Sequence, residues 1–202
     1  MKKLLSLILL TALLSGATNA WGQKDSRRIF VNFGASFQDP GSKKDELAGK
    51  GYGGFLSVGR NNILLAGNKA HLCLDTGLDL SYFASPYNSM PGRYLIATET
   101  SKDRFKNIGL LLGVSGELKI NSLWSLQPYF RVSPTVSWYD NTLWERGGNG
   151  LGIYCIPGLA LSWRLLSVGG EWRWGRNNYK DSADIKSKYE FDALRVYIGI
   201  RF

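Results

Sequence analysis

One histidine and two aspartates, spaced four residues apart, are the residues of this chain best suited to acid–base chemistry. His71, Asp75 and Asp79 follow one another in the segment HLCLDTGLD. Paired carboxylates can act as general acid and base. His71 is the only histidine in the sequence, so any Ser-His-carboxylate or His-metal site would have to use it. Structural hydrogen bonding is the competing role for His71.

Other charged residues of both signs recur in similar alternating segments. We predict that eight of them form an interior charge network: Asp75, Asp79, Glu117, Lys119, Arg131, Glu171, Arg173 and Arg195. Buried charges must be paired, so a salt-bridged plug is a simpler account of these residues than catalysis, and it argues against a wide pore. We accordingly predict no catalytic, cofactor or metal site.

The two cysteines, Cys73 and Cys155, could in principle pair in an oxidising compartment. Cys73 falls in the same alternating series as Asp75, whereas Cys155 falls in an apolar series with Ile153 and Leu159. A disulfide needs converging side chains, so none is expected.

The elements that position these residues are β-strands, because side-chain polarity alternates with a period of two. From His71 to Tyr82, for example, leucines alternate with polar or small residues. The strands are predicted at 28–38, 51–60, 71–82, 107–120, 125–139, 150–163, 166–176 and 191–202. They predict an all-β fold, an eight-stranded antiparallel up-and-down transmembrane β-barrel.

The apolar series is predicted to face outward. An eight-stranded barrel barely holds side chains, and the bulky apolar residues of all the strands would overfill it. The opposite register would expose Lys119, Arg131, Arg173 and Arg195 to lipid, at roughly 2–4 kcal/mol each near the midplane.

Long polar connections at 39–50, 84–106, 140–149 and 177–190 alternate with short turns near 61–68, 121–124 and 164–165. This asymmetry indicates extracellular loops and periplasmic turns. Two aromatic belts are expected, with Phe37, Tyr52, Tyr82, Trp138 and Trp174 at the loop end and Trp124, Trp163 and Phe202 at the turn end. Pro128, Pro134 and Pro157 lie within predicted strands, where bulges are expected to accommodate them.

Residues 1–20 have the pattern of a cleaved signal peptide. Lys2 and Lys3 precede an apolar stretch that is too short to span a bilayer, and small residues follow up to Ala20. Cleavage after Ala20 would leave one barrel domain, 21–202. The net charge of +9 would otherwise suggest a nucleic-acid partner, but export to the envelope argues against one.

The last strand, FDALRVYIGIRF, resembles the carboxy-terminal assembly signal of bacterial outer-membrane barrels. The matching residues are Val196, Ile198, Ile200 and Phe202. The stricter pattern has glycine where this chain has Tyr197, so only the looser form is met. Together with the signal peptide and the strands, the mature chain resembles the small eight-stranded family that includes the transmembrane domain of outer membrane protein A. No segment corresponds to the wall-binding domain that follows that barrel.

The resemblance implies a location in the bacterial outer membrane and contact with lipid, lipopolysaccharide and the barrel assembly machinery. It leaves the activity open, because family members include adhesins, structural anchors and lipid-modifying enzymes. Those enzymes work at the loop end, and His71 is predicted at the turn end. The leading hypothesis is a non-enzymatic barrel with a surface or structural role. The alternatives are a lipid A-modifying enzyme, a narrow solute channel and a soluble barrel of the lipocalin kind.

Overall fold

The computed structural model describes residues 29–39, 51–86, 102–141, 146–181 and 186–202. The predicted signal peptide, residues 1–20, and most of the predicted loops 39–50 and 84–106 lie outside these residues. No helix in the described ranges is long and apolar enough to span a membrane.

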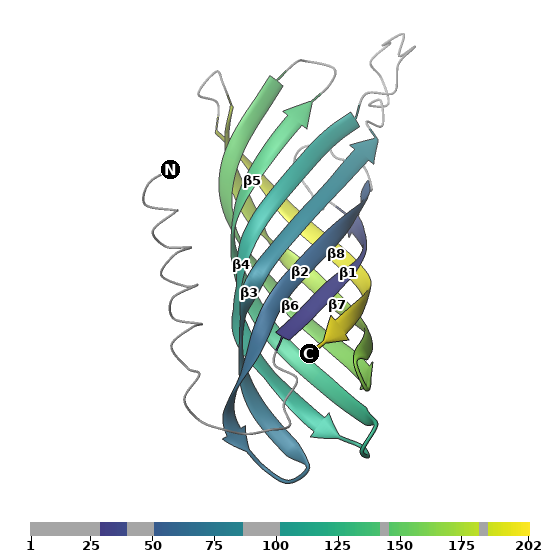
Figure 1. Cartoon of the computed structure of the whole chain (residues 1–202). Helices are drawn as coiled ribbons and strands as arrows, with labels where there is room; N and C mark the ends of the chain where they lie inside the picture. Colours follow the sequence, from purple (N-terminus) through teal and green to yellow (C-terminus); the bar gives the residue numbers. More distant parts are fainter. Residues whose placement is uncertain (1–28, 40–50, 87–101, 142–145, 182–185) are drawn as a thin grey trace.

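Strands make up almost all of the described chain, and short turns join them at one end. Their bounds are β1 Ile29–Asp39, β2 Gly51–Ala66, β3 Ala70–Pro86, β4 Lys102–Lys119, β5 Trp124–Asn141, β6 Arg146–Trp163, β7 Leu166–Asp181 and β8 Lys186–Arg201. Each pairs antiparallel with the next, and β1 pairs with β8, so that the sheet closes into a barrel. Figure 1 shows β1 beside β8, with all strands tilted around the barrel axis. The predicted fold is confirmed.

The barrel has a fixed stagger that follows from its pairing register. Following paired residues once around the ring, from Ile29 on β1 through every strand, leads back to β1 at Asp39, ten positions further along. Stagger and strand tilt are linked in closed barrels, where tilts are roughly 35–45°. This tilt leaves an interior that side chains from opposite walls can bridge.

Side chains alternate between the interior and the outer surface, as the sequence pattern predicts. On β8, Leu194, Val196, Ile198 and Ile200 are 43–50% exposed, whereas the alternate residue Arg195 is fully buried. The same alternation holds on the other strands, where leucine, isoleucine, valine and aromatic side chains cover the outside. The predicted outward register of the apolar series is confirmed.

Several strands are longer than predicted. The segments 140–149 and 177–190 were expected to be loops because they are polar, yet β5, β6, β7 and β8 cover most of them. Backbone hydrogen bonds maintain the ladder whatever the side chains are. Gly147 and Gly148, for example, pair with Asp140 and Tyr139 of β5. Polarity alone therefore made these two predicted loops longer than the connections in the structure.

The prolines do not cause bulges, contrary to expectation. Pro128 and Pro134 pair with β6 in an unbroken register, and only the bridges on their β4 side are missing. The bridges between β6 and β7 are interrupted in the same way at Pro157. A missing N–H removes a hydrogen bond, but the register on either side of each proline is the same. Within the described ladders, a shift occurs between Ile63 and Leu65 of β2.

Tight turns join the strands at the end where β1 begins. The Asn121 side chain accepts hydrogen bonds of 2.8 Å from the backbone N–H groups of Leu123 and Trp124, an Asx turn between β4 and β5. Arg164 has a φ of 54° in the two-residue connection between β6 and β7, which suits a tight hairpin. We call this end of the barrel the turn end and the opposite end the loop end.

Candidate functional site

The barrel interior holds the predicted charged residues, and its first layer is built around Asp75 of β3. Arg131 of β5 donates from Nε to this carboxylate at 2.8 Å, and Ser115 Oγ of β4 donates at 2.6 Å. The Asn61 side chain of β2 also donates to Asp75. Both charged groups are at most 1% exposed, so each is neutralised by a partner rather than by water.

A second layer is centred on Arg195 of β8. Its guanidinium donates to both carboxylate oxygens of Asp79, at 2.9 and 3.1 Å, and to Glu171 at 3.1 Å. Tyr129 Oη donates to the other oxygen of Glu171 at 2.8 Å. The Tyr129 hydroxyl also lies 3.1 Å from that of Tyr197. Two carboxylates from different strands therefore share one arginine.

Aromatic rings cover the faces of the buried guanidinium groups. The Arg131 guanidinium lies 4.0 Å from the ring centroid of Tyr129, and that of Arg195 lies 4.4 Å from Phe55. The Arg173 guanidinium lies 3.6 Å from the ring of Tyr154. Cation–π contacts are strongest where water is excluded, so the rings add to the neutralisation of these cations.

A chain of amide and hydroxyl groups continues from the second layer toward the loop end. Arg173 Nη1 donates to Ser81 Oγ at 3.0 Å, and the Asn107 amide donates to the same hydroxyl at 3.2 Å. Ser137 Oγ donates to the Asn107 carbonyl oxygen at 2.6 Å. The Asn177 amide donates to Ser137 Oγ at 2.7 Å. Side chains from four strands are linked in this way.

Aromatic side chains fill the interior at the loop end, which the sequence analysis did not anticipate. The Phe83 and Phe105 rings are stacked with centroids 4.4 Å apart, and Phe191 meets both edge-on at 5.6 and 5.3 Å. Tyr139 and Tyr179 pack against Phe105. These residues belong to the inward series of their strands, so the alternation that placed the charges inside also placed these rings there.

The predicted network residues divide into two groups. The interior layers unite six of them: Asp75, Asp79, Arg131, Glu171, Arg173 and Arg195. Glu117 and Lys119 instead line a cavity at the turn end, because their positions near the end of β4 lie beyond the ion-paired layers. This placement differs from the single network that was expected.

His71 and the cysteines lie apart from the ion pairs. The His71 ring is partly buried, and its Nδ1 has no hydrogen-bond partner among the described residues, so the hydrogen bonding expected of this residue is not seen at that atom. Cys73 and Cys155 are both free, the first buried inside the barrel. They form no disulfide with each other, as expected for two side chains that belong to opposite alternating series of their strands.

The outer surface has exposed aromatic residues near both ends of the barrel. Those near the loop end are Phe37, Tyr52, Tyr82, Trp138 and Trp174, with exposed fractions of 41–66%. At the turn end, Trp124 and Trp163 are paired across β5 and β6, with ring centroids 6.3 Å apart, and Phe202 is 58% exposed. These positions agree with the two predicted belts.

The residues of the predicted assembly signal lie on the outside of the seam that closes the barrel. Val196, Ile198, Ile200 and Phe202 are all exposed. The Phe202 N–H donates to the Ile29 carbonyl at 2.9 Å, and the Ile29 N–H donates back at 3.1 Å. The terminal aromatic therefore belongs to the β1–β8 closure.

The interior arrangement braces opposite walls of the barrel. Arg131 of β5, Arg173 of β7 and Arg195 of β8 all reach acceptors on β3, at Asp75, Ser81 and Asp79. Asp75 and Asp79 are therefore held in fixed ion pairs that link the two walls.

Comparison with known proteins adds a likeness of fold. No protein-family model and no curated protein matches the chain. Among solved structures, Neisserial surface protein A aligns at 12% identity with a TM-score of 0.47, over 88% of this chain and 98% of that one. Ail of Yersinia pestis aligns at 11% identity and a TM-score of 0.43, over 87% and 97%. The outer membrane protease OmpT of Escherichia coli aligns at 10% identity and 0.49, over 92% and 100%.

By their names, the first is a surface protein, the second an attachment invasion locus protein and the third an outer membrane protease. A barrel fold by itself does not select an activity.

Proposed function

We propose that this chain is an integral protein of the bacterial outer membrane without enzymatic activity, which acts at the cell surface or supports the envelope. The observation that carries the proposal is the distribution of polar and apolar side chains, which is the reverse of that in a soluble protein. Apolar side chains cover the outside, whereas Arg131, Arg173 and Arg195 are at most 1% exposed inside. A barrel in water would gain by the reverse arrangement, since apolar surface is stabilised by removal from water.

This distribution also weighs against a soluble carrier of the lipocalin kind. A lipid carrier needs an apolar interior, whereas ion pairs cross the middle of this barrel. Cell fractionation tests the choice. We expect the protein in the outer-membrane fraction, with migration on gels that changes on heating. Recovery in the soluble periplasmic fraction would reject the membrane location, and sequencing the amino terminus would test cleavage after Ala20.

We further propose that the barrel does not conduct solutes. The two ion-paired layers and the aromatic cluster follow one another along the interior, and an eight-stranded barrel leaves little room beyond its side chains. Planar-bilayer recordings should show no defined channel steps, although the same samples contain inserted barrel. Regular conductance steps that are lost when the gene product is omitted would contradict this proposal.

The absence of catalysis is tested most directly on lipid A, the substrate of the alternative hypothesis. Each interior carboxylate that the sequence suggested for acid–base work is held by an arginine. Lipid A extracted from cells with and without the gene should have the same acylation pattern. A change that is restored by the intact gene would replace this proposal with a lipid-active enzyme.

Lipopolysaccharide is the partner that we propose for the loop end. Arg104 and Lys106 lie on the outward series of β4 and are exposed close to its loop-end start. Cations at that height meet the phosphates of the outer leaflet if the loops face outward, and lysine and arginine are attracted to anionic surfaces. The exposed pair Arg176 and Glu190, 2.7 Å apart on β7 and β8, lies at the same end.

A further inference from the structure

Arg164 is an unusual residue for its position at the turn end. It is the first of the two residues that join β6 to β7, and its φ of 54° lies in the left-handed region. In the described part of the chain it is the one non-glycine residue with a positive φ. Glycine or asparagine is favoured at such turn positions, because other side chains strain the backbone. A strained arginine whose side chain is exposed points to a role for that side chain outside the fold.

Two tryptophans form an aromatic platform beside Arg164. Trp124 of β5 and Trp163 of β6 pair across the strands, with ring centroids 6.3 Å apart, and are 39% and 43% exposed. The Arg164 guanidinium lies 5.8 Å from the centroid of the Trp163 ring, within cation–π distance. An exposed cation is thus placed beside the exposed indoles of the turn-end belt, at the height where such rings meet lipid head groups.

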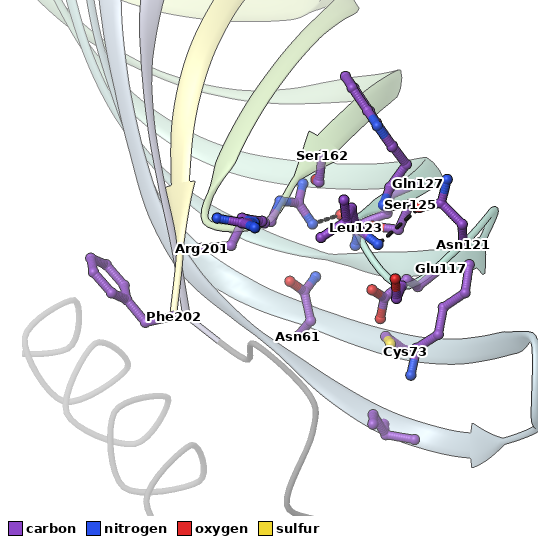
Figure 2. A pocket seen from close by; sticks show the side chains of 15 residues that line it. Asn61, Cys73, Glu117, Asn121, Leu123, Ser125, Gln127, Ser162, Arg201 and Phe202 are labelled. Atoms are coloured by element: carbon purple, nitrogen blue, oxygen red, sulfur yellow. Dashed lines mark hydrogen bonds between the residues drawn. The ribbon is translucent and has the colours of Figure 1, made fainter.

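Backbone hydrogen bonds hold this platform in place. The Arg164 N–H donates to the Leu123 carbonyl oxygen at 2.9 Å, which links the turn between β6 and β7 to the turn between β4 and β5. The Asn121 side chain fixes the second turn by accepting from the N–H groups of Leu123 and Trp124. Figure 2 shows Asn121 and Leu123 side by side at the cavity of the turn end. The cation and the indoles are therefore preorganised, which lowers the entropy cost of binding a ligand.

The donors of the Arg164 guanidinium are available to a ligand. Among the described residues this group contacts the Trp163 ring and makes no hydrogen bond or ion pair. Glu117 lines the same cavity as Arg164, but no ion pair joins them. The parallel N–H groups of a guanidinium match two oxygens of a phosphate. A phosphate diester carries a single negative charge, which one exposed cation can balance.

The apolar surroundings indicate that the phosphate belongs to a lipid. Leu123 precedes Trp124 in the chain, Leu165 follows Arg164, and Leu166 pairs with Trp163 across the hairpin. These three leucines are 42–52% exposed. A free phosphate ion would leave them and the indoles in water, whereas the glycerol and acyl chains of a phospholipid would cover them.

We propose that Arg164, Trp163 and Trp124 form a binding site for the phosphate diester of a phospholipid in the leaflet at the turn end. Arg164 donates to two phosphate oxygens, and the two indoles pack against the glycerol part of the lipid. The site rests on the membrane location proposed above. It explains why an arginine occupies a turn position that favours glycine, and it anchors the end of the barrel that lies opposite to the lipopolysaccharide.

Native mass spectrometry of the full barrel in uncharged detergent micelles tests the site by counting bound lipid. The probes are dioleoylphosphatidylglycerol, dioleoylglycerol, which lacks the phosphate, and inorganic phosphate. We expect saturable binding of one phosphatidylglycerol molecule. The other two probes should bind about tenfold more weakly or worse, because each lacks one half of the ligand.

R164Q should weaken phosphatidylglycerol binding about fivefold or more, since the paired donors are lost. K69Q is the matched control, because Lys69 is an exposed cation at the same end, and it should change the dissociation constant by no more than about twofold. R164G should lose as much binding as R164Q. Its urea midpoint in micelles without phospholipid should equal or exceed that of the wild type, because glycine adopts a φ of 54° without strain.

Several results would overturn the proposal. They are wild-type affinity in folded R164Q or R164G, equal binding of dioleoylglycerol and phosphatidylglycerol, and equal losses in K69Q and R164Q. A lower urea midpoint of R164G would also count against it, since Arg164 would then serve the fold. Cell fractionation tests the membrane location separately. A barrel that is found in the outer membrane but binds no phosphatidylglycerol rejects this site alone.

Discussion

At the scale of single residues, Arg195 pairs with two buried carboxylates. It joins Asp79 and Glu171, which come from β3 and β7. All three groups are buried, so removing the arginine leaves two carboxylates close together without the cation that pairs with both. Loss of one partner from a buried pair is far more costly than the net stabilisation that the pair provides.

Replacing Arg195 with glutamine should therefore lower the free energy of unfolding by about 3–5 kcal/mol. Urea unfolding of the barrel in lipid vesicles, followed by tryptophan fluorescence, measures the change. R176Q is the control, because Arg176 pairs with Glu190 on the surface, with the two side chains 59% and 61% exposed. That pair should contribute at most about 1 kcal/mol. Equal losses in the two variants would contradict the interior role of Arg195.

The inward direction of the arginines could be predicted from the sequence, but their partners could not. Alternation along β8 determines that Arg195 faces the same way as Arg201. The partner of Arg195, Asp79, is 116 residues away in the sequence. Their meeting depends on the stagger of the closed sheet, which is a property of all the pairings together.

At the scale of the strands, glycines on the inward series make room for large rings from the neighbouring strand. A Cβ added at Gly158 of β6 would lie 2.5 Å from Cε2 of the Tyr129 ring on β5. Tyr129 in turn positions Glu171 through its hydroxyl. Space at Gly158 is therefore coupled to the second layer of ion pairs.

The variant G158A should be less stable than wild type by about 1–3 kcal/mol, the usual range for overpacking. G170A is a matched control, because a Cβ there would meet the Arg195 carbonyl oxygen at 3.7 Å, an ordinary contact. Urea midpoints of both variants in vesicles give the comparison. If G170A is destabilised as much as G158A, the ring contact is not the cause.

The ends of the strands could not be predicted from apolar alternation. Apolar alternation locates the part of each strand whose outer face is apolar, and it ends where side chains become polar. β7 nevertheless continues to Asp181 and β8 begins at Lys186, because the backbone ladder continues between them. The prolines are the converse case, since a missing donor interrupts bridges without changing the register.

A substitution at Phe202 can test the assembly of the barrel separately from its stability. Its backbone closes the seam with Ile29, and these two hydrogen bonds do not need the phenyl ring. Replacing Phe202 with serine should reduce the amount of folded barrel in cells several-fold and leave refolding of the purified chain into micelles unchanged. F33S is the control, because Phe33 is equally exposed at 59% on β1. Similar losses for both variants in cells would show a general effect of apolar surface rather than an assembly signal.

At the scale of the whole molecule, the two ends of the barrel differ in a way that suits an asymmetric membrane. Tight turns join the strands at one end, and the described strands stop short of the longer connections at the other. In Figure 1 the turns gather at the lower end, with the carboxy terminus nearer to them than to the loop end. If the loop end lies in the outer leaflet, the outward cations Arg104 and Lys106 meet lipopolysaccharide phosphates there.

Replacing both of these cations with glutamine should weaken the stabilisation that lipopolysaccharide provides, by about 1 kcal/mol for each charge. The measurement compares unfolding in vesicles with and without lipopolysaccharide. Lys69 and Arg164, exposed at the turn end, provide a control with the same loss of charge, and K69Q/R164Q should behave like wild type. The lipopolysaccharide is confined to the leaflet that holds the loop end, so that the turn-end cations do not meet its phosphates. An equal loss in the two double variants would then mean that net charge, rather than the loop-end position of Arg104 and Lys106, determines the interaction.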